Sequence, residues 1–244
     1  MKLLVAIARC LYTICLPVLL FTTTVAVAVN CSWLYIHGFE KYDVRQSLAD
    51  NGLNLTDADI KEITKDFIHY FNSSDEYINL TVQQDGKSVP FFNTEETIHF
   101  KDVKRLFRLD YYIALGTLVY WLSFTLVMIF WKRGIYRKKL ARDMVIGSAV
   151  TLGLMLLLGI GILLDFDSLF LRFHFIAFSN DFWSAEGNML LLTPSGFWND
   201  VFIYGTMTIM ILALILGGAS GAYLAYRRKK DKAITPPPST SSGS

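Results

Sequence analysis

The sequence predicts an α-helical integral membrane protein with four transmembrane helices and a small mixed α/β extracytoplasmic cap. Hydrophobic residues make up 53% of the 244 residues, and they are clustered rather than spread periodically. This composition excludes an ordinary soluble domain. Crossing a hydrocarbon core takes roughly 20 apolar residues. Four runs are long enough: Leu3–Val29, Tyr111–Trp131, Met144–Leu164 and Val201–Tyr226.

The charges between these runs predict the orientation of the chain. The link 132–143 carries six basic side chains and one acid, and the tail 227–244 carries five basic side chains and one acid. Residues 30–110 hold nine basic and fourteen acidic side chains, and residues 165–200 hold one basic and five acidic side chains. Basic short loops stay in the cytoplasm. We therefore expect both termini and the link inside, with the cap 30–110 and the aromatic loop 165–200 outside.

The first apolar run is expected to remain as a membrane anchor. Residues 26–28 read Ala-Val-Ala, a pattern of signal-peptide cleavage sites, but the run of 27 residues exceeds the roughly 7–15 of a signal sequence. Arg9 lies inside this run, so it must reach the interface or face a partner helix. Cys10 and Cys15 also lie inside it, whereas Cys31 lies near the outer surface, so no intramolecular disulfide is expected.

Local patterns predict the elements of the cap. Thr56, followed by Asp57 and Asp59, reads as a helix start. Apolar residues then recur at helical spacing, at Ile60, Ile63, Phe67 and Phe71. Two short strands, Asn79–Val82 and Ser88–Phe92, flank Asp85-Gly86 and predict a hairpin.

A second helix of the cap is predicted to continue into the second span. Asn93 or Thr94 can cap it, and it carries His99 with Asp102 three residues later on the same face. At the other end of the chain, residues 235–244 are a low-complexity tail rich in Pro and Ser, which is typical of disorder.

The aromatic loop 165–200 has an unusual composition. Nine of its 36 residues are Phe or Trp. An interfacial belt of aromatic rings, which is common at membrane surfaces, accounts for many of them. It does not account for the titratable His174 and the charged Arg172 in their midst.

Few residues offer chemistry. The sequence has no Gly-x-Ser-x-Gly nucleophile elbow, no His-Glu-x-x-His zinc helix and no glycine-rich phosphate loop. Nothing marks Cys31 as an activated nucleophile, and the spacing of His and acidic residues does not favour a metal site. His37 and His69 are best explained by packing or surface exposure. His99 and His174 remain as candidate acid–base residues at a membrane surface. They do not identify a substrate.

At these residues the chain resembles the bacterial lipoprotein intramolecular transacylase family. The resemblance rests on the plan of four spans with a cap and on the run His99-Phe-Lys-Asp102-Val103-Lys104 before the second span. It rests equally on a second set before the fourth span, namely Phe173-His174, Phe178, Trp183, Leu191, Pro194 and Phe197-Trp198.

The resemblance implies an acyltransferase of the bacterial plasma membrane that acts on diacylglyceryl-modified lipoproteins. The acyl chain at the glyceryl sn-2 oxygen would move to the α-amino group of the substrate's own N-terminal cysteine, which gives a lyso-form lipoprotein. No cofactor, metal or nucleic acid is implied, the partners are the lipoprotein and membrane lipids, and we expect a monomer with its active site at the outer surface.

Within that reading, His99 and His174 are the catalytic pair, one as base and the other as acid or oxyanion stabiliser. The expected supporting residues are Asp102, Arg172, Phe173, Phe178, Trp183, Phe197 and Trp198. Asp102 has two alternative roles, orienting His99 or pairing with Arg105. Two other functions stay open: a non-enzymatic lipid- or lipoprotein-binding membrane protein, and an intermolecular phospholipid acyltransferase or lipase using Cys31 or a metal.

Overall fold

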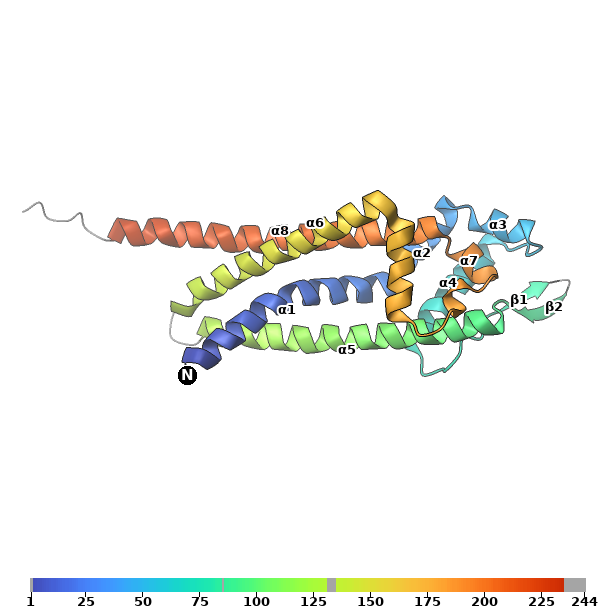
Figure 1. The fold of residues 1–244 in the computed structure, drawn as a ribbon, viewed down its shortest axis with the longest axis horizontal. Coiled ribbons are helices and arrows are strands. Elements are labelled where there is room, and N and C mark those ends of the chain that lie inside the picture. The colour runs from blue at the N-terminus through green and yellow to red at the C-terminus, as the bar shows by residue number, and fades with distance from the viewer. Residues whose placement is uncertain (1, 85, 131–134, 235–244) are drawn as a thin grey trace, which may run out of the picture. The chain divides into compact units, whose positions relative to one another are not determined.

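The computed structural model describes residues 2–84, 86–130 and 135–234, most of which are helical (Figure 1). Four helices are long and apolar enough to cross a membrane: α1 (Lys2–Val29), α5 (Thr94–Phe130), α6 (Ile135–Ala177) and α8 (Ser195–Ile234). The predicted fold class is confirmed. The predicted disordered tail 235–244, Asp85 of the predicted turn and residues 131–134 lie outside the described residues.

The cap contains three helices and a hairpin: α2 (Ser32–Lys41), α3 (Val44–Asp50), α4 (Asp57–Asn72), β1 (Thr81–Gln84) and β2 (Lys87–Pro90). The predicted start of α4 is confirmed, because Thr56 and Asp59 form a reciprocal capping box. The predicted hairpin is also present, with Val82 opposite Val89. Its strands span Thr81–Gln84 and Lys87–Pro90 rather than the predicted Asn79–Val82 and Ser88–Phe92, and the rings of Phe91 and Phe92 are buried in the core. The sequence reasoning did not find α2 and α3.

The chain divides into two compact units, and the first comprises Met1–Leu20, Thr117–Gly153 and Met210–Ser244. Within it, the buried hydroxyl of Tyr12 lies 3.1 Å from both Thr125 Oγ1 and Met144 Sδ. The guanidinium of Arg9 donates two hydrogen bonds of 2.7 Å to the Asp143 carboxylate. Arg9 thus faces a partner helix, which is one of the two outcomes expected for it.

The second unit comprises Phe21–Gly116 and Leu154–Ile209, and its core is largely aromatic. The ring of Phe67 packs edge-on against Phe71 and Phe100, with centroids 5.0 Å away in both cases. Phe197, at the start of α8, is only 2% exposed. A Cβ at Gly38 would lie 2.3 Å from the Phe197 ring, so glycine allows α2 to pack closely on it. Phe197 therefore belongs to this core.

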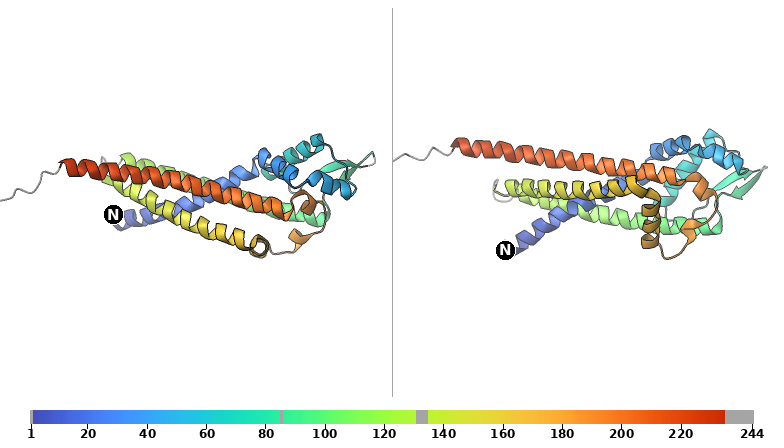
Figure 2. Two further views of the ribbon diagram at one scale, coloured as in Figure 1. Left: turned by 90° about the horizontal axis from the view of Figure 1, so that it is seen from above. Right: turned by 45° about the horizontal axis from the view of Figure 1, so that its top comes forward.

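Helix α6 bends sharply at Asp165, whose backbone is not helical (φ −163°, ψ 86°). The Asp165 carboxylate accepts a hydrogen bond of 3.0 Å from the Ser168 amide, as a helix N-cap does. In Figures 1 and 2 the part of α6 after Asp165 runs across the direction of the part before it.

Residues 165–200, which were expected to form a loop, are mostly helical in the structure. They contain the end of α6, a short 3₁₀ turn η1 (Phe182–Ser184), α7 (Asn188–Leu192) and the start of α8. The spacing of Phe166, Phe170 and His174 is the i, i+4 spacing of a helix face. The aromatic composition of these residues predicts an interfacial belt, whereas their spacing predicts the helix that the structure contains.

We predict that Asp165→Ala destabilises the bend, since it removes the acceptor for the Ser168 amide. The free energy of unfolding should fall, because the capping bond is lost. Amide hydrogen exchange should become faster in residues 166–168, as measured by mass spectrometry in detergent. Asp165→Asn keeps a capping oxygen and should exchange like the parent protein. Equal exchange in the alanine and asparagine variants would show that the cap does not hold the bend.

Candidate active site

The fold brings His99 on α5 and His174 on α6 together. Their ring centroids lie 6.1 Å apart. His99 is 6% exposed and His174 is 8% exposed, so both imidazoles are buried. The bend in α6 matters here, because His174 lies in the part of the helix that follows Asp165.

Aromatic rings surround the two imidazoles. The centroid of the His174 ring lies 4.4 Å from Phe170, 5.1 Å from Trp183 and 5.3 Å from Phe173. Phe178 contacts both histidines, at 4.9 Å from His99 and 5.6 Å from His174. Of the predicted supporting residues, Phe173, Phe178 and Trp183 thus lie at the pair.

The hydrogen bonds of the pair differ between the two rings. Nδ1 of His174 lies 2.7 Å from the carbonyl oxygen of Phe170. A carbonyl oxygen only accepts, so Nδ1 must carry the proton, and the neutral ring then has its lone pair on Nε2. Nδ1 of His99 is buried and has no hydrogen-bond partner among the described residues. His99 therefore retains an unused donor or acceptor position.

Burial sets the protonation of both rings, which lie outside the apolar stretches 111–131 and 144–164. Burial lowers the pKa of His99 to about 4; the neighbouring His174 lowers it further, whereas Asp102 opposes the shift. Burial also lowers the pKa of His174, against the effect of its bond to the Phe170 carbonyl. Both imidazoles are consequently neutral at pH 7.

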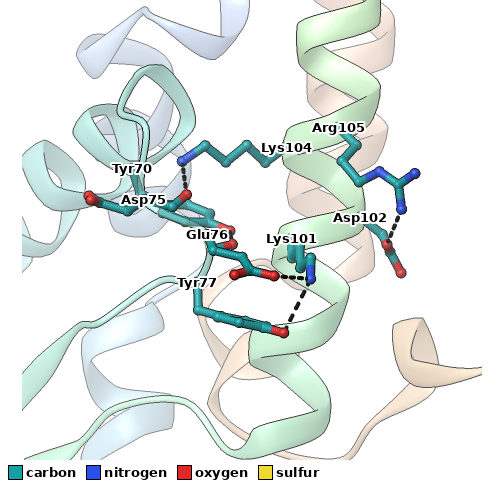
Figure 3. Close-up of polar contacts among 8 residues, drawn as sticks. All are labelled: Tyr70, Asp75, Glu76, Tyr77, Lys101, Asp102, Lys104 and Arg105. Carbon is teal, nitrogen blue, oxygen red and sulfur yellow. Dashed lines mark hydrogen bonds and ion pairs between the residues drawn. The ribbon is translucent and has the colours of Figure 1, made fainter.

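Asp102 bonds to residues other than His99. One of its carboxylate oxygens accepts a hydrogen bond of 2.9 Å from the Asn180 side chain. The other lies 3.8 Å from the guanidinium of the exposed Arg105, a pair drawn in Figure 3. No hydrogen bond joins Asp102 to His99 in the part of the chain that the structure describes. Of the two roles expected for Asp102, the pairing with Arg105 is present.

Basic side chains on another side of α5 hold the segment 73–77 of the cap (Figure 3). Lys101 Nζ lies 2.5 Å from the Glu76 carboxylate and donates to the Tyr77 hydroxyl. Lys104 is 2% exposed, and its Nζ donates a bond of 2.7 Å to the Asp75 carbonyl. These contacts fix the first turns of α5, and with them His99, against the cap.

The other predicted site residues lie farther from the imidazoles. Trp198 packs on Phe170, with centroids 5.9 Å apart, and so lies behind the ring that contacts His174. Arg172 is exposed, and its charge acts on Asp165 rather than on the pair. Phe197 is part of the core of the second unit.

Sequence reasoning missed Glu96, which lies three residues before His99. Its side chain is 1% exposed, and its two carboxylate oxygens accept hydrogen bonds from the amides of Met189 (2.6 Å) and Asn93 (2.7 Å). Burial raises the pKa of Glu96, and the two amide bonds oppose that rise. In the sequence Glu96 looks like an ordinary acid in a first helical turn, so only its three-residue spacing from Asn93 could have marked it.

The family model described as "Lipoprotein intramolecular transacylase Lit" matches residues 10–198, a range that contains both histidines. No curated protein matches the chain.

Among solved structures, the chain is similar to the membrane integral lipoprotein intramolecular transacylase Lit from Bacillus cereus. The identity is 19%, the match covers 94% of this chain and 100% of that chain, and the TM-score is 0.77. Two structures of variants of that protein, in which one histidine is replaced by arginine or alanine, match with 18% and 17% identity. They cover 93% and 92% of this chain and 94% and 95% of theirs, each with a TM-score of 0.70. These likenesses show the fold.

The lowered pKa of His99 predicts how stability depends on pH. An unfolded histidine titrates near pH 6.5, whereas folded His99 titrates near pH 4. The unfolded state therefore binds more protons between these values, and stability rises with pH across that window, by up to about 3 kcal/mol. Chemical unfolding in detergent at a series of pH values measures this slope. His99→Phe should show a clearly smaller slope, and an equal slope would contradict the assignment.

Proposed function

The chain belongs to the lipoprotein intramolecular transacylase family and is an acyltransferase of the membrane, and on that premise we propose the transfer that it performs. The sn-2 acyl chain of a diacylglyceryl lipoprotein moves to the α-amino group of the same molecule's N-terminal cysteine. The observation that carries this proposal is the buried, neutral pair His99 and His174, which suits proton transfer during ester aminolysis.

The reaction needs proton transfer and folding of the substrate. The amine nitrogen attacks the acyl carbon, the new C–N bond forms, and the bond from the acyl carbon to the sn-2 oxygen breaks. Attack closes an eight-membered ring within the substrate, and the proton lost by nitrogen ends on the glyceryl oxygen. Holding such a ring in a reactive geometry can supply on the order of 7–11 kcal/mol at best. Because the nucleophile belongs to the substrate, no nucleophilic side chain is required.

The hydrogen bonds suggest a role for each imidazole. His174 has its Nδ1 proton committed to the Phe170 carbonyl, so its Nε2 is free to take the proton from the substrate's nitrogen. The Nδ1 of His99 has no partner among the described residues. A neutral His99 protonated there donates a hydrogen bond to the oxyanion and keeps its proton. His174 passes the proton that it took from nitrogen to the departing glyceryl oxygen, so one proton moves and both rings end neutral. Neither residue forms a bond to the acyl group.

The aromatic surroundings support an acyl transfer in preference to hydrolysis. Phe170, Phe173, Phe178 and Trp183 occupy the space around His174 that water would otherwise fill. Excluding water protects the ester and strengthens the electrostatic interactions of the pair. It also keeps His174 neutral, which is the state that accepts a proton.

We place the pair at the outer face of the plasma membrane, with both termini in the cytoplasm and the protein acting as a monomer. The distribution of basic residues supports this orientation. The helix segment after Asp165 also carries exposed apolar side chains next to His174, since Phe175 is 62% and Ile176 is 87% exposed. Contact of these side chains with acyl chains would bring the pair to the depth of a lipid ester.

The test is fragmentation mass spectrometry of a diacylglyceryl reporter lipoprotein incubated with purified protein. Transfer within one molecule leaves the intact mass unchanged, so fragments must locate the acyl group. We predict acyl on nitrogen with the parent protein, and a loss of rate of about 10²-fold or more with His99→Ala and with His174→Ala.

Two further histidines and one cysteine serve as matched controls. His37→Ala, His69→Ala and Cys31→Ser should keep activity close to that of the parent protein. Loss of activity in Cys31→Ser would favour an intermolecular acyltransferase with a covalent intermediate. A free substrate amine after incubation with folded parent protein would overturn the proposed transfer.

A further inference from the structure

The segment 180–189 places Trp183 against His174 and is attached to α5 on both sides of His99. We call residues 180–189 the strap. It contains η1, with Trp183 in its middle, and the centroid of the Trp183 ring lies 5.1 Å from that of His174. The strap is thus the element that sets one aromatic wall of the pair.

The first end of the strap is attached through Asp102. Asn180 donates a hydrogen bond of 2.9 Å to the Asp102 carboxylate, and its own amide oxygen accepts a bond of 3.2 Å from the Phe182 amide. Asp102 lies three residues after His99, about one helical turn along α5.

The other end is attached through Glu96, about one turn before His99. The Met189 amide donates a hydrogen bond of 2.6 Å to Glu96 Oε1. Asn93 adds a bond of 3.1 Å to the carbonyl of Glu186, and Asn188 adds one of 2.6 Å to the carbonyl of Phe91. The approach is so close that a Cβ at Gly187 would lie 2.3 Å from Glu96 Oε1.

We propose that Glu96 is a positioning residue for the transfer: by holding the strap it keeps Trp183 over His174 and water away from the pair. This inference rests on the proposed function and adds a residue to it. Glu96 touches neither imidazole in the contacts of the described chain, so it acts through the strap.

The two oxygens of Glu96 have separable tasks. Oε2 accepts from the Asn93 amide, while the Asn93 side-chain oxygen accepts from the Glu96 amide, which is the reciprocal cap of α5. Oε1 serves the strap alone. Glutamine is competent in a capping box, but it has one acceptor oxygen. In Glu96→Gln, the amide oxygen can keep the bond from the Asn93 amide, and the NH₂ group then faces the Met189 amide. The cap is retained, but the strap loses its hydrogen bond to residue 96.

The experiment compares Glu96→Gln with Glu95→Gln, which makes the same chemical change at an exposed neighbour on the same helix. With the reporter lipoprotein, Glu96→Gln should lower kcat by about 10- to 100-fold, as a small misplacement of a reacting group does. KM should stay nearly constant. Glu95→Gln should retain parental kinetics.

The pH profile separates positioning from a loss of folded protein. When water reaches the pair, the lowered pKa values of His99 and His174 return toward the ordinary value. The acid limb of the profile should therefore move to higher pH in Glu96→Gln. The charged group near His99 is Asp102, which this substitution does not change. A uniform fall at all pH values would overturn the proposal.

Two more variants keep the test decisive. Gly187→Ala pushes the strap away from Glu96 without changing the carboxylate. It should therefore reproduce the loss of kcat and the shift of the acid limb to higher pH, even if Glu96→Gln does not fold. In a Trp183→Ala background, Glu96→Gln should lower kcat little further, because both changes remove the contact of the Trp183 ring with His174. Full additivity, or parental kinetics in folded Glu96→Gln, would overturn the inference while leaving the transfer itself intact. Absence of transfer by the parent protein would instead overturn the proposed function.

Discussion

The broken helix at Asp165 is the feature on which the arrangement of the pair depends. A continuous helix would carry residues 166–177 onward along the axis of the preceding segment. Asp165 instead leaves helical geometry and caps a new helix by accepting the Ser168 amide. His174 lies roughly two and a half helical turns after Asp165. This new helix therefore brings His174 to His99. A short polar side chain at the end of an apolar run thus redirects the chain without any loop.

Once the two imidazoles meet, their protonation follows from their surroundings. Both rings are buried among aromatic side chains, which disfavours the charged form. The bond from His174 Nδ1 to the Phe170 carbonyl then decides the tautomer. One neutral imidazole can accept a proton at its unprotonated nitrogen while the other donates a hydrogen bond from its N–H. The proposed transfer therefore depends on the contacts that keep water out, including the strap attached to Glu96.

Several features could be predicted from sequence because each depends on a strong local signal. Long apolar runs give the spans, and the Thr56 cap and the spacing of Phe67 and Phe71 give α4. His174 could be singled out because it is out of place in an aromatic stretch, and His99 because it shares a predicted helix face with Asp102 and lies in the run that resembles the family. Glu96 did not emerge, because its burial is created by residues 186–189, far away in the chain. The bend at Asp165 was missed for a related reason: an acid at the end of a span also reads as the start of a loop.

The central claim is that the enzyme moves protons while the acyl group never leaves its own substrate molecule. A crossover experiment tests this claim directly. Two diacylglyceryl lipoproteins are mixed, one with deuterated acyl chains and a light peptide, the other with light acyl chains and an isotopically heavy peptide. Mass spectrometry of the N-acylated products then shows which acyl chain joined which peptide. The account predicts only the two parental combinations. Mixed products would mean that the acyl group is released or carried by the protein, and would contradict it.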